Sequence, residues 1–235
     1  MQLLTPLFLI ALAAMVATRW WLAGRQRAAV RAHRDAVPAE FAGAISADAH
    51  RRAADYTDAR LRLGRVELLL DALVLLLVTL GGGLAAVDRL VATAGLAAPW
   101  HGVAVLVALG LAVAAAGLPF AWHSTFRIEQ RFGFNRTTPR LFLADLVRTT
   151  LLSLVLGVPL LALLLWLMDV AGPRWWLYAW AAWVAFGLGI TYAYPRFIAP
   201  LFNTFRPLAA GELRERVERI VARCGFASQG VYVMD

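Results

Sequence analysis

The chain has 235 residues, of which 61% are hydrophobic and only 16% are charged. Soluble domains average about 25% charged residues, so this composition and a mean hydropathy of +0.66 exclude a disordered chain and disfavour a soluble fold. The formal net charge is +8, and all 23 basic residues are arginines. These arginines cluster between apolar segments, which indicates a role in membrane topology and no nucleic-acid partner. The single cysteine, Cys224, excludes an intrachain disulfide and a cysteine-rich metal site.

Five apolar segments are each long enough to cross a bilayer, which takes about 20 helical residues. Backbone groups inside a membrane must be paired within their own segment, so these segments are predicted to be helices. The first has no positive charge before Arg19, which favours a signal anchor over a cleaved signal peptide. The predicted fold is therefore an all-α, polytopic membrane protein with five transmembrane helices, at about 3–23, 66–87, 100–122, 143–168 and 175–194.

The arginines alternate between rich and poor links, and this pattern predicts the orientation. The link from Gly24 to Arg65 contains nine arginines, whereas the next link contains only Arg89. The third link contains four arginines, and the fourth contains only Arg174. Because arginine-rich links remain in the cytosol, the N-terminus is predicted outside and the C-terminus inside.

The links and the tail contain structure of their own. Residues 46–65 are predicted to form a helix that continues into the second span, and an alternative is a basic helix lying against anionic lipid. In the tail, an aromatic, proline-containing loop at 197–207 precedes an amphipathic helix at 212–223, which Gly225 ends. A short strand at 231–234 has no predicted partner. Residues 1–195 are therefore predicted to form the membrane region, and 196–235 the beginning of a cytosolic α+β domain that continues beyond the chain.

No catalytic or metal-ligating residue is predicted. None of the four histidines belongs to an HExxH motif, and no GxSxG motif is present. The ionisable residues near the membrane form two groups with helical spacing, Glu67 with Asp71 and Asp145 with Arg148. Each group could pair internally or snorkel, or the four side chains could line a polar chamber.

Two stretches of the sequence resemble a known family. One is FRIEQRFGFNRTT, from Phe126 to Thr138, and the other is IAPLFN, from Ile198 to Asn203, which continues through Phe205, Pro207 and the Gly-Glu-Leu at 211–213. Both are similar to signatures of the CAAX prenyl proteases, a family of integral-membrane zinc metalloproteases. The resemblance covers essentially the whole chain and is strongest after Phe126.

The resemblance implies a role as the N-terminal membrane region of such a protease. In the family, the helices enclose a water-filled chamber, and HExxH and a downstream glutamate ligand follow the strand. This chain ends before them, so no zinc ligand is assigned and the segment alone is expected to be inactive. Zinc, a peptide or protein substrate and a C-terminal peptidase domain are expected in the full-length protein, in a bilayer that is expected to be a bacterial inner membrane. The substrate need not be prenylated.

The two signatures also suggest a surface that the peptidase domain covers. Aromatic side chains and turn-forming residues lie there in links that the charge rule places in the cytosol. An aromatic belt at the membrane interface is the alternative. A different class of function is a non-catalytic five-helix scaffold that binds lipid or a partner. The predicted docking residues are Glu129, Phe132, Gly133, Phe134, Asn135, Pro200, Phe202 and Asn203.

Overall fold

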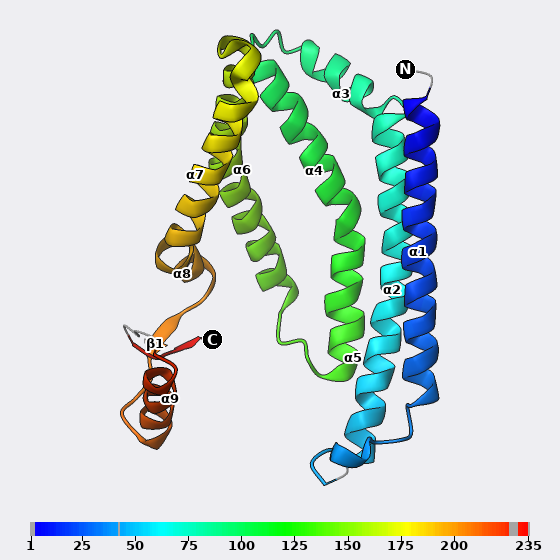
Figure 1. Cartoon of the computed structure of the whole chain (residues 1–235), viewed down its shortest axis with the longest axis vertical. Coiled ribbons are helices and arrows are strands. Elements are labelled where there is room, and N and C mark those ends of the chain that lie inside the picture. The colour runs from blue at the N-terminus through cyan, green and yellow to red at the C-terminus, as the bar shows by residue number, and fades with distance from the viewer. Residues whose placement is uncertain (1–2, 42, 226–229, 235) are drawn as a thin grey trace. The chain divides into compact units, whose positions relative to one another are not determined.

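The structure, a computed structural model, describes residues 3–41, 43–225 and 230–234. It divides into two compact units, Met1–Thr150 and Leu151–Asp235, which are described separately below. Helices dominate both units, which confirms the prediction of a helical, polytopic fold (Figure 1).

A long helical hairpin opens the first unit. Helix α1 (Leu4–Ala32) and helix α2 (Ala47–Thr79) lie side by side and antiparallel (Figure 1), with a short 3₁₀ turn η1 (Ala39–Phe41) in the link. Ser46 caps α2 by accepting a 3.2 Å hydrogen bond from the backbone N–H of Ala49. The helix predicted at 46–65 therefore continues into the second apolar segment, as expected.

The second predicted span, at 66–87, is wrong as one continuous helix. Helix α2 ends at Thr79, and helix α3 (Gly83–Ala92) leaves it at an angle of 56°. Glycine accounts for the bend, because Gly82 has φ +76° and a Cβ on Gly81 would lie 2.9 Å from the Leu77 carbonyl oxygen. The glycine triplet thus closes one helix and begins the next.

The third predicted span belongs to a helix that continues well past its apolar segment. Helix α4 (Trp100–His123) passes into a π-helical turn, η2 (Ser124–Glu129), and then into helix α5 (Gln130–Phe132). Together they form a 33-residue helical segment. Helix α6 (Pro139–Val170) follows and contains the fourth predicted span.

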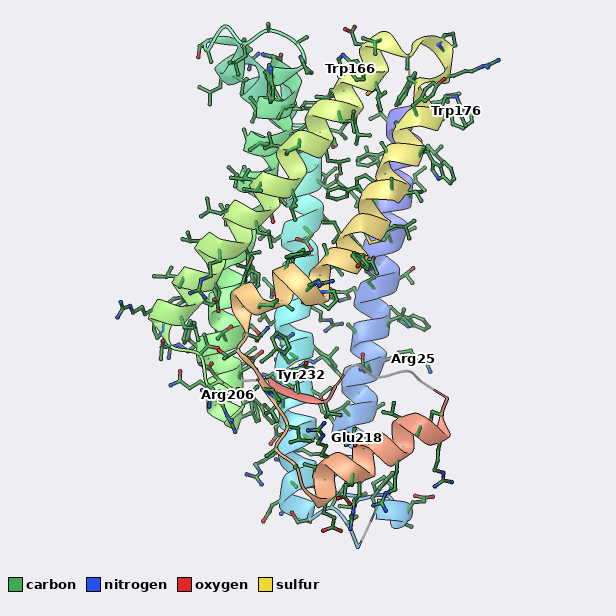
Figure 2. All side chains as sticks on the ribbon, turned by 90° about the vertical axis from the view of Figure 1, so that its left-hand side faces the viewer. Arg25, Trp166, Trp176, Arg206, Glu218 and Tyr232 are labelled. Atoms are coloured by element: carbon green, nitrogen blue, oxygen red, sulfur yellow. The ribbon has the colours of Figure 1, made fainter. Side chains whose placement is uncertain are left out.

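The second unit contains α6 from Leu151 onward and the chain that follows. A 3₁₀ turn, η3 (Gly172–Arg174), leads into helix α7 (Trp175–Ala193), which passes through a π-helical turn, η4 (Tyr194–Ile198), into helix α8 (Ala199–Phe202). Figure 2 shows Trp166 and Trp176 near the turn between α6 and α7. Tryptophan is enriched where helices leave a membrane, so this turn suits an interface position.

A small sheet and an amphipathic helix complete the second unit. Strand β1 (Phe205–Pro207) pairs antiparallel with strand β2 (Tyr232–Met234), and Arg206 lies opposite Val233. The prediction that the strand at 231–234 has no partner is therefore wrong. The partner is three residues long and includes a proline, so it gives no alternating pattern. Helix α9 (Glu212–Arg223) lies between the strands in sequence and confirms the predicted amphipathic helix.

The apolar surface of the helices is largely uncovered, as a lipid-facing protein requires. By length and composition, three helices among the described residues can cross a membrane, or four if the bent pair α2–α3 is one span. Helix α7 is not one of them; its 19 residues include four tryptophans and two tyrosines, which lower its hydropathy. Large apolar residues such as Leu151 and Val155 are 57% and 68% exposed.

Candidate functional site

The first signature segment folds into a defined helix stop. Gly133 adopts φ +79°, and its N–H donates to the carbonyl oxygen of Gln130. The N–H of Phe134 reaches back to the carbonyl oxygen of Glu129 at 2.9 Å. These two bonds are those of a Schellman motif, which needs a left-handed residue at the glycine position. The predicted role of Gly133 in a tight turn is therefore confirmed.

The residues after the glycine turn the chain into α6. The side-chain oxygen of Asn135 accepts a 2.6 Å hydrogen bond from the N–H of Thr137, and Thr138 Oγ1 accepts one from Leu141 at 3.2 Å. Pro139 then begins the helix, where its missing N–H costs nothing. The FGFNRTT part of the signature thus forms the connection between two long helices, and its own local hydrogen bonds determine its shape.

Aromatic side chains of the signature pack against the N-terminal part of α2. Tyr56 makes edge-to-face contacts with Phe132 at 5.4 Å and with Phe134 at 5.0 Å between ring centroids. Phe132 is half-buried, whereas Phe134 remains 63% exposed. Tyr56 therefore holds the turn in place and leaves most of the Phe134 ring uncovered within the part of the chain that the structure describes.

A polar contact reinforces the same junction. Arg60 on α2 donates a hydrogen bond to the buried Ser124 hydroxyl, and its guanidinium lies 3.9 Å from the Glu129 carboxylate. Glu129 thus contributes both its backbone carbonyl and its side chain to the structure of the turn. The five predicted docking residues of this signature, 129 and 132–135, form one continuous turn beside α2.

The sequence did not indicate the role of Asp58, the most buried charged residue among those that the structure describes. Asp58 is 8% exposed, and arginines from both helices of the hairpin surround it. Arg27 binds it at 2.8 Å, Arg31 donates two bonds at 3.1 and 3.2 Å, and Arg62 binds it at 2.8 Å. The spacing of Asp58 and Arg62 was visible in the sequence, but the two arginines of α1 were not expected to face it.

The arginines determine the charge state of this carboxylate. Desolvation raises the pKa of Asp58, but the hydrogen bonds from Arg27, Arg31 and Arg62 outweigh it, and the pKa lies far below its usual range. Nearby, Arg34 binds Asp55 at 2.7 and 2.9 Å and lowers the pKa of that carboxyl group. Both carboxylates are therefore ionised at neutral pH. Asp58 joins α2 to α1, and Asp55 joins α2 to Arg34 in the link that follows α1.

A cavity of about 1020 Å³ opens between α2 and the π-helical extension of α4. Arginines, the two carboxylates, a histidine and a glutamine form its polar lining, and apolar side chains form the rest. The residues that line it are Asp55, Asp58, Ala59, Arg62, Leu63, Val66, His123, Phe126, Arg127, Ile128, Gln130, Arg131 and Phe132.

The second signature belongs to the second unit and has a separate groove. Phe202 and Asn203 are half-buried where α8 ends, and Asn203 donates its N–H to the carbonyl oxygen of Ala199 at 3.1 Å. Pro200 lines a groove of about 1020 Å³. Figure 2 shows Arg206 and Tyr232 on the paired strands beside it. The groove is lined by Leu188, Thr191, Tyr192, Pro195, Arg196, Pro200, Phe205 and Tyr232.

The four predicted chamber residues fall into two local groups. On α2, Glu67 is half-buried, and the exposed Asp71 lines a pocket of about 300 Å³ with Ala116 and Gly117 of α4. On α6, Asp145 and Arg148 form an ion pair at 3.1 Å. Among the described residues, no ion pair or hydrogen bond joins the two groups.

The described residues do not fit a zinc site. No group of three or more histidine, cysteine, aspartate or glutamate side chains converges anywhere among residues 3–41, 43–225 and 230–234. His101, one of the four histidines, instead lies 2.8 Å from the Asp88 carboxylate. No chemical step is therefore assigned to a metal within this segment.

Known proteins share this architecture. The family model described as CAAX prenyl protease N-terminal, five membrane helices, matches residues 26–204. The chain belongs to this family. The crystal structure of Ste24p from S. mikatae superposes with a TM-score of 0.87 and 23% identity, and the match covers 95% of this chain and 53% of that one.

Curated family members match in sequence over a shorter stretch. The CAAX prenyl protease 1 homolog of Arabidopsis thaliana is 40% identical over 113 residues, which are 48% of this chain and 27% of the relative. The Homo sapiens homolog is 32% identical over 113 residues, which are 48% of this chain and 24% of the relative. The matches thus span about a quarter of these relatives and about half of the solved structure. They identify an N-terminal, multi-pass membrane region of a CAAX prenyl protease-like protein.

Proposed function

We propose that residues 1–235 form the N-terminal membrane region of an integral-membrane zinc metalloendopeptidase. In this proposal, residues 1–195 enclose the chamber, 196–235 begin the peptidase domain, and the zinc is held by residues that follow Asp235. The segment alone is then inactive. The single observation that carries the proposal is the family match over 26–204, which includes the first signature and the IAPLFN part of the second.

The shape of the two signature segments supports a docking role. Each follows a long apolar helix through a π-helical turn, η2 after α4 and η4 after α7. Such turns are rare and often occur at functional sites. We propose a docking surface on each unit, with Phe132 and Phe134 on the first and with Pro200, Phe202 and Asn203 on the second.

Uncovered apolar groups in the tail support the same proposal. Leu213 is 64% exposed and Ile220 is 61% exposed on the apolar face of α9, a helix held by i,i+4 arginine–glutamate pairs. A two-stranded sheet is marginally stable by itself in water. A peptidase domain would cover this face and extend the sheet.

The proposed orientation is N-terminus outside and C-terminus inside, in a bacterial cytoplasmic membrane. Single cysteines at Ala44, Ala98, Thr138 and Ala171, introduced after Cys224→Ser, are expected to report inside, outside, inside and outside. The reason is the alternation of arginine-rich and arginine-poor links. Labelling of intact cells with a membrane-impermeant maleimide measures the positions, and lysed cells control for reactivity. If the cysteine at position 44 is labelled in intact cells and the cysteine at position 98 is not, the predicted orientation is wrong.

Peptide cleavage by the purified full-length protein tests the proposed function. Quenched fluorescent peptides, one set with a farnesylated cysteine and one without, are incubated in detergent with and without a zinc chelator. Cleavage that the chelator abolishes and added zinc restores is expected, because a metal-activated water performs the hydrolysis in this class of enzyme. Cleavage that resists the chelator would indicate another class of protease and contradict the proposal.

A further inference from the structure

The cavity between α2 and the π-helical extension of α4 has a charge pattern that the proteolytic proposal does not use. Its two carboxylates are already bound by arginines, Asp55 by Arg34 and Asp58 by Arg27, Arg31 and Arg62. Arg127 and Arg131 also line it and are exposed. Within the part of the chain that the structure describes, no ion pair joins either of these two arginines to a carboxylate.

These two arginines and a histidine form a stripe along one wall. His123, Arg127 and Arg131 are spaced four residues apart, and all three line the cavity from the segment that contains the π-helical turn. Gln130 adds a neutral polar side chain to the same wall. Guanidinium groups bind phosphate oxygens through paired hydrogen bonds, so the stripe suits a phosphate ester.

The apolar part of the lining and the position of the cavity indicate a lipid rather than a soluble ligand. Leu63, Val66 and Phe126 contribute apolar side chains to the cavity. Val66 begins the second apolar segment and His123 follows the third, so the cavity lies where two helices leave the bilayer. At this depth, a phospholipid presents its phosphate to the arginines and its first acyl carbons to the apolar side.

We propose that this cavity binds the headgroup of an anionic phospholipid, with Arg127 and Arg131 contacting the phosphate. Its volume of about 1020 Å³ is at the upper end of small-molecule sites, which suits a phosphoglycerol headgroup with the upper part of its chains. Asp58 holds Arg62 in place, and its bonds to Arg27 and Arg31 fix this part of α2 against α1. The proposal does not depend on proteolysis and can fail or succeed separately from it.

Thermal unfolding of the purified full-length protein in detergent tests the site. Palmitoyl-oleoyl phosphatidylglycerol is added in increasing amounts, and palmitoyl-oleoyl phosphatidylcholine and inorganic phosphate serve as separate probes. Phosphatidylglycerol is expected to raise the unfolding temperature, and the other two probes are not. In Arg127→Gln/Arg131→Gln, the half-maximal lipid concentration is expected to rise roughly tenfold or more, because each interfacial arginine contributes about a fewfold to such binding.

A matched variant separates this site from general surface charge. Arg136→Gln/Arg140→Gln removes the same charge from exposed arginines of the next connection, outside the cavity, and is expected to respond like the wild type. An equal response of both double variants to phosphatidylglycerol would overturn the proposal. A shift produced by inorganic phosphate would also overturn it, because the ligand would then be a free anion. If the double variant does not fold, Arg127→Gln alone must show a severalfold loss, and a wild-type response would overturn the site.

Discussion

Replacement of Asp58 by alanine is expected to lower the free energy of unfolding by about 2 to 4 kcal/mol. The carboxylate is 8% exposed and holds three arginines, so its loss leaves their charges close together without a counterion. Breaking a fully buried pair costs about 3 to 5 kcal/mol. We expect the lower range of about 2 to 4 kcal/mol for Asp58→Ala because Arg31 and Arg62 are 54% and 61% exposed and remain hydrated. Unfolding of residues 1–235 in mixed micelles, followed by circular dichroism, measures the change.

Asp55→Ala is the matched control for this prediction. Asp55 lies one helical turn before Asp58 on α2, but its side chain is 43% exposed and pairs with Arg34. Exposed pairs contribute about 0 to 1 kcal/mol, so this variant is expected to stay close to the wild type. If both variants lose the same free energy, the buried cluster has no special role in joining α1 to α2.

The same cluster predicts how stability depends on pH. The pKa of Asp58 is lowered in the folded protein, so the protonated carboxyl group is favoured in the unfolded chain. The contribution to stability is complete above the unfolded pKa of about 3.9 and is lost as the pH falls toward the folded pKa. The wild type is therefore expected to lose more stability than Asp58→Asn between pH 5 and about 3. Parallel pH profiles of the two proteins would contradict this assignment.

Several parts of the fold were predictable from the sequence because their signals are local. The apolar segments were long enough to be assigned as helices, and Gly133 and Asn135 marked a turn that the backbone confirms. The glycine run at 81–83 lies inside the span predicted at 66–87, where α2 and α3 meet at an angle of 56°. Local signals of this kind depend on steric rules that a few residues express by themselves.

Features that depend on register between distant segments were not predictable. Arg27 and Arg31 face Asp58 because α1 continues to Ala32, beyond the end of its apolar segment. Tyr56 as the partner of Phe132 and Phe134 likewise depends on how α2 packs against the end of α4. Strand β1 has three residues and no alternation, so only pairing with β2 reveals it.

Phe134→Ala is expected to act mainly in the full-length protein. In residues 1–235 the ring is 63% exposed and touches Tyr56 edge-on, so its removal should cost about 0.5 to 1 kcal/mol. If the peptidase domain covers the ring, truncation there should cost about 3 kcal/mol and lower the cleavage rate about tenfold or more. Thermal unfolding of both proteins and peptide cleavage by the full-length protein provide the comparison.

Phe41→Ala is the matched control for Phe134→Ala. Phe41 is 52% exposed in η1 and belongs to neither signature, so Phe41→Ala should affect the two proteins equally and weakly. Membrane insertion should be normal in both variants, because the apolar segments determine it. If Phe134→Ala destabilises residues 1–235 as much as the full-length protein, the ring packs within the membrane region and the docking surface is wrong.

Metal analysis of the purified proteins tests the central proposal most directly, because it does not require the substrate to be known. The described residues bring together no group of three or more potential metal ligands, and the chain contains no HExxH motif. Inductively coupled plasma mass spectrometry is expected to find one zinc per full-length chain and no stoichiometric zinc in residues 1–235. One tightly bound zinc in residues 1–235, or none in the full-length protein, would contradict the assignment as the membrane region of a zinc metalloendopeptidase.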